Sequence, residues 1–324
     1  YYENLNSPSG DQKISASCHK GERTMELKVL KNEAPDIHPS AVIHPSAIIH
    51  KNVVIGAYAY IGENCEIGEG TIIGPHAVIA KNVRMGKENH IYPHAVIGED
   101  PQDLKFADEY STVVIGDHNL LREYVTIHRA TGENCETRIG SYNMLQAYTH
   151  VAHNCCFGDH IVMSSFSGAA GHVTVEDHAV IGGMSGLHQF VKIGACAMVG
   201  GMSKIVQDVC PYVIADGNPA RVVGLNSVGL SRNGITPEGK SLLKKAYRII
   251  FRSGMKLSEA IEEMEQDFPS TPEVEHLLRF LRNCEAASAV PEKETDKKAI
   301  KKAPAAYPFA AGVLICRAKT ISFS

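Results

Sequence analysis

The sequence lacks the C-x-x-C spacing of common zinc sites, although it contains nine cysteines. An odd number of cysteines with no disulfide framework favours reduced thiols in a cytosol-like compartment. It also lacks a long apolar run: the longest, Phe309 to Cys316, is too short to span a bilayer. A net charge of -4 gives no broad basic surface for nucleic acid or membrane. We therefore expect a soluble, cytoplasmic protein that binds no nucleic acid and has no membrane span.

The first residues lack both an initiating methionine and the apolar core of a signal peptide. Lys20-Gly21-Glu22 lies shortly before Met25, and its codons can spell a purine-rich ribosome-binding sequence. We expect translation to begin naturally at Met25. Residues 1–36 are predicted to be a leader outside the fold.

One apolar residue recurs at every sixth position over much of the chain. This period excludes an amphipathic helix, whose period is about 3.6 residues, and indicates a hexapeptide repeat. Glycine often follows the apolar residue, as in Ile55-Gly56 and Ile181-Gly182. The register comprises Ile37, Ile43, Ile49, Ile55, Ile61, Ile67, Ile73, Ile79, Met85, Ile91 and Ile97, then Ile115, Leu121 and Ile127, then Ile139, Leu145, Val151, Phe157, Met163, Ala169, Val175, Ile181, Leu187, Ile193, Val199 and Ile205.

Each hexad is expected to form a short strand and a corner, with three hexads completing one coil. The sequence thus predicts a mainly β fold, a parallel β-helix over residues 37–210. Two segments keep the register but place acidic residues at inward positions: Asp103 and Glu109 in residues 98–114, and Glu133 in residues 128–138. These segments are predicted to leave the coil as loops, where function is often found.

The pattern changes after Pro211. Residues 211–229 are predicted to connect the coil to a small α-helical domain at 230–284. Thr236, Pro237 and Glu238 are typical of an N-cap, a first-turn proline and an acidic first turn. Further helices are expected at 257–268 and from Pro272. Residues 285–324 are predicted to be a disordered tail.

His150 and His153 flank the inward residue Val151, so both are predicted to point outward from the coil. No histidine of the repeat region occupies an inward position, which argues against buried core imidazoles. Six others lie three residues after an inward residue, which a simple preference for corners would also explain: His76, His94, His118, His160, His172 and His178.

Several motifs together resemble the family of UDP-N-acetylglucosamine O-acyltransferases that begin lipid A biosynthesis. The resemblance runs from about Ile37 to Asn283 and implies the left-handed form of the β-helix. It is more specific than the hexads, which many acetyltransferases share. The motifs are QDLK (102–105), REYVTIHR (122–129), THVAHNC (149–155), AAGHV (169–173), GLHQF (186–190), QDVCPYVIADGNPA (207–220), GLSRNG (229–234) and AYRIIFRSG (246–254).

The resemblance implies transfer of a 3-hydroxyacyl chain from acyl carrier protein to the 3-hydroxyl of UDP-N-acetylglucosamine. It implies no cofactor of the protein's own, because the acyl chain arrives on the carrier's phosphopantetheine, and no metal. By motif, His153 is the implied general base and Gly171 the implied main-chain donor to the oxyanion. A base is needed because a sugar hydroxyl is scarcely ionised at neutral pH. No covalent acyl-enzyme is implied, which leaves Cys155 and Cys156 as spectators.

Other residues are implied to bind the substrates. Asp103 and Lys105 belong to a loop that reaches the sugar and acyl groups. Asn226 and Arg232 are implied to contact the nucleotide and its phosphates, since a guanidinium matches phosphate oxygens. The implied cleft residues are His128, His150, His172, His188 and Gln189.

Three positions deserve comparison with the family pattern. Asn154 follows His153 where many members have aspartate, which leaves open what orients the imidazole. Asn233 follows Arg232 where a basic pair is frequent. Gly201 matches the position that sets acyl length in the family; with no Cβ it should leave the groove long, although Met198 could shorten it.

Flat outer faces of such a coil usually pack against copies of themselves, so a homotrimer with clefts at its subunit boundaries is expected. The helical domain offers a basic group that should attract an acidic carrier protein. It consists of Lys244, Lys245, Arg248 and Arg252.

Three alternatives stay open at this point. A γ-type carbonic anhydrase has the same fold, and His150, His153 and either His128 or His172 could supply zinc ligands. A sister acyltransferase could use another UDP-sugar, including a 3-amino analogue. A non-enzymatic scaffold would need no histidine-lined cleft. The QDLK and GLHQF loops and the helical domain favour the acyltransferase over the hydratase.

Overall fold

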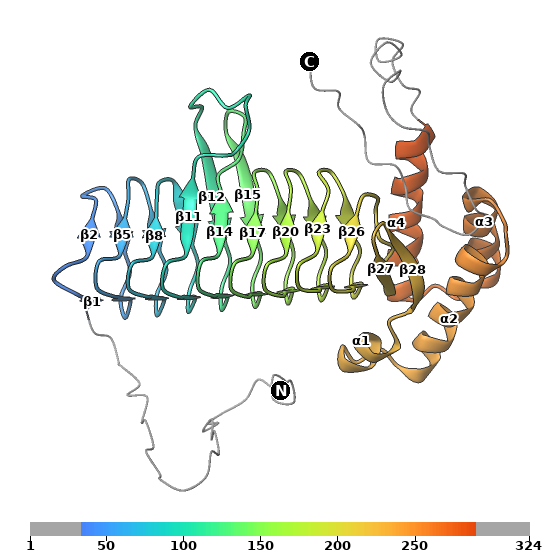
Figure 1. Ribbon diagram of the computed structural model, residues 1–324. Helices are drawn as coiled ribbons and strands as arrows, with labels where there is room; N and C mark the ends of the chain where they lie inside the picture. Colours follow the sequence, from blue (N-terminus) through green and yellow to red (C-terminus); the bar gives the residue numbers. More distant parts are fainter. Residues whose placement is uncertain (1–33, 290–324) are drawn as a thin grey trace, which may run out of the picture. The chain divides into compact units, whose positions relative to one another are not determined.

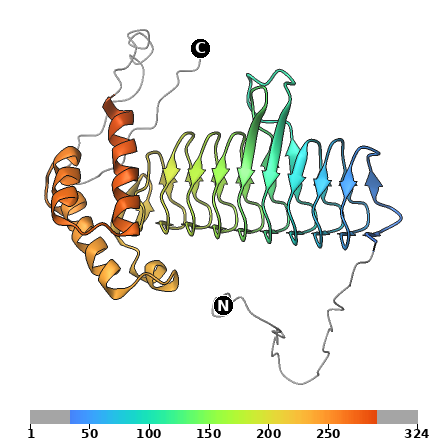
Figure 2. The ribbon, with the colours of Figure 1, turned by 180° about the vertical axis from the view of Figure 1, so that it is seen from behind.

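The computed structural model describes residues 34–289, with side chains as far as residue 284. The expected start at Met25 and the predicted tail beyond 289 lie outside the described residues. Short strands wind into a coil that runs from residue 36 to the helices at its far end (Figures 1 and 2).

Three sheets form the sides of the coil, and we name them faces A, B and C. Face A contains β1 (Asp36–Ile37), β4 (Val54–Ile55), β7 (Ile72–Ile73), β10 (His90–Ile91), β13 (Leu120–Leu121), β16 (Met144–Leu145), β19 (Val162–Met163), β22 (Val180–Ile181), β25 (Met198–Val199), β27 (Val213–Gly217) and β28 (Ala220–Leu225). Face B contains β2 (Val42–Ile43), β5 (Tyr60–Ile61), β8 (Val78–Ile79), β11 (Val96–Glu99), β14 (Thr126–His128), β17 (His150–Val151), β20 (Gly168–Ala169), β23 (Gly186–Leu187) and β26 (Lys204–Ile205). Face C contains β3 (Ile48–Ile49), β6 (Glu66–Ile67), β9 (Val83–Met85), β12 (Ser111–Ile115), β15 (Cys135–Ile139), β18 (Cys156–Phe157), β21 (Thr174–Val175) and β24 (Lys192–Ile193).

The period-six residues line the inside of this coil, as predicted. Strands of successive coils pair in parallel with inward residue opposite inward residue, for example Val151 opposite Ala169. Ile55 through Ile205 are almost fully buried at these positions, whereas Ile37, at the open end, is 39% exposed. The three parallel sheets and the helices that follow them confirm the predicted fold class.

The corners account for six of the 16 histidines. The six histidines placed three residues after an inward position all have φ between 57° and 62°. Residues at such corners stack their rings from coil to coil. One ladder joins Tyr58, His76, His94, Tyr124, Tyr148 and Phe166, with successive centroids 4.8 to 5.1 Å apart.

The two predicted loops project from the coil beside β12 and β15 (Figure 1). They are shorter than predicted, because β11 continues to Glu99, β12 begins at Ser111, β14 continues to His128 and β15 begins at Cys135. The loops are therefore residues 100–110 and 129–134. β12 and β15 pair over five residues, which draws the ends of both segments into face C.

The helical region begins earlier and ends later than the predicted 230–284. It comprises α1 (Ser227–Arg232), α2 (Pro237–Arg252), α3 (Leu257–Asp267) and α4 (Pro272–Ala289). Thr236 caps α2 as expected, since its hydroxyl accepts from the Gly239 N–H at 3.1 Å. The predicted connection 211–229 instead holds an antiparallel hairpin, β27 and β28, which extends face A.

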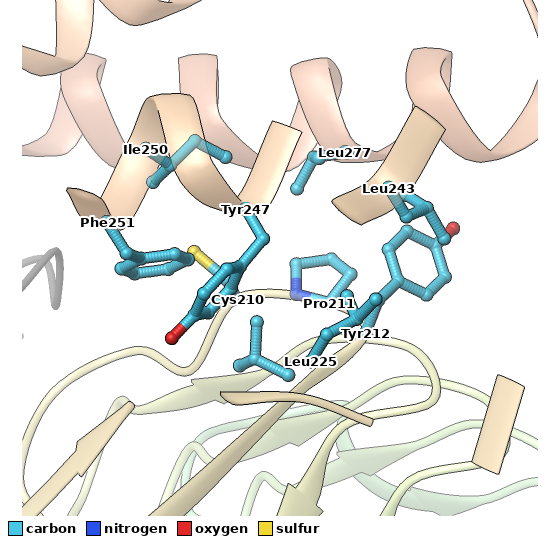
Figure 3. A pocket seen from close by; sticks show the side chains of 10 residues that line it. Cys210, Pro211, Tyr212, Leu225, Leu243, Tyr247, Ile250, Phe251 and Leu277 are labelled. Carbon is cyan, nitrogen blue, oxygen red and sulfur yellow. The ribbon is translucent and has the colours of Figure 1, made fainter. Parts of the chain in front are cut away.

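Apolar packing and one polar chain join the helices to the end of the coil. Figure 3 shows Tyr247, Phe251 and Leu277 of the helices facing Pro211 and Leu225. The space left among them is about 10 Å³, which is room for no more than a water molecule.

The polar chain starts on α4. His276 Nδ1 is 2.9 Å from the Tyr212 hydroxyl, and its Nε2 is 3.0 Å from Glu176 Oε2. The carboxylate of Glu176 also accepts from the Ala195 N–H at 2.8 Å. This chain and the apolar seam fix α4 against the coil.

Ile193→Ala in β24 should destabilise the fold by about 2 to 5 kcal/mol, because it leaves a cavity among close-packed inward residues. Lys192→Ala is the matched control on the same strand, since Lys192 is exposed and Ile193 is fully buried. Urea denaturation followed by circular dichroism would measure both. Equal shifts of the two midpoints would contradict the assignment of the inward face.

Candidate active site

The candidate site lies at the corner between faces B and C, next to the two loops. His153 follows β17 and stands two residues beyond the buried Val151, so its side chain leaves the coil at this corner. Its side chain is 14% exposed. Both loops leave from the same kind of corner, between β11 and β12 and between β14 and β15. The loops therefore border His153.

One ring nitrogen of His153 is held by its neighbour in sequence. Nδ1 of His153 is 2.8 Å from Oδ1 of Asn154. The Asn154 amide is held by the main chain of Thr131: Oδ1 accepts from the Thr131 N–H and Nδ2 donates to the Thr131 carbonyl, each at 3.0 Å. The Asn154 N–H donates to Thr137 Oγ1 at 2.9 Å. Asn154 thus links the imidazole to loop 129–134.

The other ring nitrogen faces the second loop and a glycine. Nε2 of His153 is 4.0 Å from Oδ2 of Asp103. A Cβ on Gly171 would lie 2.5 Å from Nε2, which is closer than side-chain carbons pack. Gly171 therefore lies directly against the imidazole, and a larger residue there would displace the His153 ring. His172 meets the same ring edge-on, with centroids 5.3 Å apart.

Two more imidazoles lie on face B beside His153. His150 Nδ1 is 2.7 Å from the Thr126 hydroxyl, and the His150 ring meets that of His128 edge-on at 4.9 Å. Burial, with the nearby His128 and His153, lowers the pKa of His150 to about 4. Burial also lowers the pKa of His128, which is 7% exposed. His128 Nδ1 is buried with no hydrogen-bond partner among the described residues.

Glu109 joins the two loops. Its Oε1 accepts from the Gly132 N–H at 2.6 Å, and its Oε2 accepts from the Ala107 N–H at 2.7 Å. These main-chain donors lower the pKa of Glu109 because they stabilise its anion. A second contact runs from the Asn134 N–H to the Tyr110 carbonyl at 2.7 Å. Loop 100–110, which contains Asp103, and loop 129–134, which contains Thr131, are therefore fastened to each other.

The surroundings of Asp103 favour its ionised form next to the imidazoles. The Lys105 N–H donates to its Oδ1 at 3.0 Å and lowers the pKa of Asp103, an effect that the nearby His153 adds to. Beneath the loops, the guanidinium of the buried Arg129 pairs with Asp100 and donates through Nε to the Gly98 carbonyl at 3.2 Å. Arg129 anchors the base of the loops.

The structure gathers His128, His150, His153, His172, Asp103 and Gly171 at one corner, and it places the remaining predicted site residues elsewhere. His188 and Gln189 lie one coil further on, where the Phe190 N–H donates to the Gly171 carbonyl at 3.1 Å. Lys105 is exposed on loop 100–110.

Met198 lies in β25. Gly201 lies at the corner that follows this strand, between faces A and B. They therefore lie at the opposite edge of face B from His153.

Arg232 and Asn226 belong to the region of α1. Arg232 is exposed, but the side chain of Asn226 is buried and used by the fold. Its Oδ1 caps α1 through the Gly229 N–H at 3.0 Å, and its Nδ2 donates to the Cys196 carbonyl at 2.9 Å. Its amide therefore holds α1 on the coil, and its contact with the nucleotide stays a prediction.

Cys155 is buried, and burial raises the pKa of its thiol to about 12. Its Sγ donates to the Ala170 carbonyl at 3.1 Å. A thiol held in this form is a poor nucleophile.

Sequence reasoning missed Thr131 and the joining role of Glu109. Thr131 acts through its main chain, which leaves no trace in residue type. Glu109 was identified only as an acidic residue at a would-be inward position. Among residues 34–284, no group of three or more histidine, cysteine, aspartate or glutamate side chains could hold a metal ion. No helix within the described part of the chain is long and apolar enough to cross a membrane.

Family models match both parts of the chain. The model described as bacterial transferase hexapeptide (six repeats) matches residues 46–81 and 64–99. The model described as UDP N-acetylglucosamine O-acyltransferase, domain 2, matches residues 208–289. The repeat and the histidine-lined corner thus belong to a hexapeptide-repeat transferase.

Relatives narrow this class. An acyl-[acyl-carrier-protein]–UDP-N-acetylglucosamine O-acyltransferase of Thermodesulfovibrio yellowstonii is 47% identical over 248 residues, which cover 76% of this chain and 96% of the relative. The enzyme of the same name from Rippkaea orientalis is 57% identical over 56% of this chain and 66% of the relative. The match to that of Gloeothece citriformis spans 65% of the relative. The chain belongs to the UDP-N-acetylglucosamine O-acyltransferase family.

Solved structures agree with this assignment. LpxA from Acinetobacter baumannii superposes with a TM-score of 0.74 at 42% identity, over 76% of this chain and 96% of that one. The UDP-N-acetylglucosamine O-acyltransferase of Moraxella catarrhalis gives a TM-score of 0.73 at 43% identity, with the same coverage.

Glu109→Ala should free the two loops from each other, because the Gly132 N–H loses its acceptor. Hydrogen exchange measured by mass spectrometry should be faster in peptides covering residues 129–134. Glu136→Ala is the control, since Glu136 lies on the adjacent β15 and pairs only with the exposed Arg138 among the described residues. Unchanged exchange in the Glu109 variant would refute the joining role.

Proposed function

We propose that this protein transfers a 3-hydroxyacyl chain from acyl carrier protein to the 3-hydroxyl of UDP-N-acetylglucosamine in the cytoplasm, the first step of lipid A biosynthesis. The observation that carries the proposal is the position of Gly171 beside His153 Nε2, with Asp103 and His172 also next to the ring. A base and a main-chain donor side by side suit acyl transfer. The names of the relatives supply the substrate class.

The reaction follows from these positions. The sugar oxygen attacks the thioester carbonyl carbon while Nε2 of His153 takes the hydroxyl proton. The carbonyl oxygen becomes an oxyanion, which the Gly171 N–H stabilises. Collapse of this intermediate breaks the carbon–sulfur bond, and the imidazolium returns its proton to the leaving thiolate. The products are the ester and the carrier thiol, with no covalent acyl-enzyme.

Neutral imidazoles beside the base suit this chemistry. With a pKa of about 4, His150 is uncharged near neutral pH and can donate from Nε2 while Nδ1 accepts from the Thr126 hydroxyl. A neutral His150 that donates from Nε2 can hydrogen-bond to the oxygen of a sugar hydroxyl, and it does not take the proton of that hydroxyl. His128, His172, His188 and Gln189 complete the substrate cleft in this proposal.

The acyl chain has an open path across face B. The outward positions of β20 and β23 are Gly168 and Gly186, and a Cβ on Gly186 would meet nothing within 4 Å. This path begins beside His153 and ends at the corner that holds Gly201. Gly201 therefore permits a long chain, and Met198, on the neighbouring strand, limits its far end.

We propose a homotrimer because the three faces of the coil differ in how apolar their outward residues are. The outward residues of face A are largely apolar, with Ile72 and Leu120 each 38% exposed. Face B carries Val78 and Val96 outward, whereas face C carries charges such as Arg84. A threefold ring joins two different faces of each subunit, and faces A and B are the apolar pair. The corner that holds His153 would then lie at the rim of this interface.

The helical region offers a site for the acidic carrier protein. An open hollow of about 350 Å³ is lined by Lys244, Tyr247, Arg248 and Arg252, together with Leu225 and Ser227. Arg232, exposed on the nearby α1, remains available for phosphates of the nucleotide, and Lys105, exposed on its loop, remains available for the sugar and acyl groups. Acidic partners are attracted to such surfaces over about a Debye length, roughly 8 Å at physiological salt.

His153→Asn should lower kcat by about 10² to 10⁴-fold, the usual contribution of a general base. The assay is transfer from 3-hydroxyacyl carrier protein to UDP-N-acetylglucosamine at matched oligomer content, with the 3-amino analogue run in parallel. His160→Asn is the control, because His160 belongs to a corner ladder away from the site and asparagine tolerates its φ of 58°. Parental activity in the His153 variant would remove it from the mechanism.

Replacing Arg248 and Arg252 with glutamine should raise KM for the carrier protein about tenfold and make this KM less dependent on salt. The reason is that charges at the edge of an interface mainly change the rate at which the two proteins associate. KM for the UDP-sugar should not change. The measurement is initial rates from low to high ionic strength. A parental salt response in the variant would place carrier docking elsewhere.

A further inference from the structure

We propose that Asn154 is a positioning residue that fixes His153 in the tautomer with the proton on Nδ1, and that an aspartate would do this less well in this chain. The inference rests on the proposed role of His153 as a base. It concerns the position where many family members have aspartate and this chain has asparagine.

The orientation of the Asn154 amide is set by its surroundings. The Thr131 N–H can only donate, and the Thr131 carbonyl can only accept. Oδ1 therefore faces the N–H and Nδ2 faces the carbonyl, each at 3.0 Å. The flipped amide would place donor against donor and acceptor against acceptor.

The amide orientation in turn decides the tautomer of His153. Nδ1 lies 2.8 Å from Oδ1, which can only accept, so Nδ1 must carry the proton. In the neutral ring the lone pair is then on Nε2. That nitrogen is the one beside Gly171 and Asp103, where the proposed base must act.

A carboxylate cannot reproduce this arrangement. One of its oxygens could accept from both Nδ1 and the Thr131 N–H, but the other would replace Nδ2 and face the Thr131 carbonyl oxygen at about the same separation. Two acceptors in contact repel each other, so loop 129–134 would have to move. An anion beside the ring would also favour the imidazolium, which is the inactive form of a base.

The backbone at this position makes a clean test possible. Asn154 has a φ of 58°, which glycine adopts without strain, so Asn154→Gly removes the amide and keeps the backbone conformation. Asn134→Gly is the matched control. Asn134 has a φ of 57° in loop 129–134, which Asn154 contacts, and its side chain is exposed.

The kinetic experiment compares the full-length parent with Asn154→Gly, Asn154→Asp and Asn134→Gly. Both Asn154 variants should lose about tenfold to a hundredfold in kcat with KM for the UDP-sugar near that of the parent, the scale expected when a reacting group is misplaced. The aspartate variant should also move the acid limb of the kcat/KM profile to higher pH. The control should match the parent in both respects.

A spectroscopic readout tests the tautomer without any substrate. The protein is labelled with ¹⁵N-histidine, and the His153 signals are identified by their loss in His153→Asn. Above the acid limb, the parent should show a pyrrole-type Nδ1 and a pyridine-type Nε2. The glycine variant should show both nitrogens shifted toward intermediate values, as exchange between two tautomers requires.

The proposal is overturned if Asn154→Gly keeps the parental kcat or the parental nitrogen shifts, or if Asn154→Asp equals the parent in kcat and pH profile. A parent that transfers no acyl chain would defeat the proposed function instead. In that case the nitrogen shifts still decide whether Asn154 fixes the tautomer.

Discussion

Parallel pairing between successive coils is the constraint on which the structure depends. It places His150 of β17 opposite Gly168 of β20, and Gly168 opposite Gly186 of β23. Residues far apart in sequence therefore share one column on face B, and their order along that column cannot slip, because a shift by one residue would expose the buried partner of each pair. The position of His153, the glycine beside it and the open strip of glycines on face B are all consequences of this register.

The two inserted loops follow strands of face B, so the paired strands of the coil fix where each loop begins. Both leave at the corner between faces B and C in neighbouring coils, so they emerge side by side. Glu109 then satisfies main-chain N–H groups in both loops. One loop places Asp103 near His153, and the other holds Asn154, whose amide contacts the same ring. Changes in loop length can thus alter the site without disturbing the core.

The inward residues could be predicted from the sequence, because the one apolar residue in each hexad is the residue that packs along the axis of the coil. It also placed His150 and His153 outside the coil. Loop limits were predicted less well, since the added ends of β12 and β15 carry polar residues, such as the buried Ser111, that are held by pairing between the two strands. Both insertions preserve the six-residue register. The sequence pattern therefore did not indicate at which residue each loop ends and the coil continues.

The hairpin of β27 and β28 was missed for a related reason. Its residues follow no period of six, and β27 joins face A by pairing Ile214 with Met198 and Ala215 with Val199. The orientation of His153 by Thr131 was equally inaccessible. It depends on main-chain atoms brought together by the fold.

Electrostatics around His153 favour a site without positive charge. Burial lowers the pKa of His128, His150 and His172, and each imidazole would repel a second cation nearby. The folded-state pKa of His150, about 4, lies below its ordinary value of 6.5. The unfolded chain therefore binds this proton more readily, so the stabilising contribution of neutral His150 is complete above pH 6.5 and is lost as pH falls toward 4. These three imidazoles are therefore neutral near neutral pH, and each can both accept and donate a hydrogen bond.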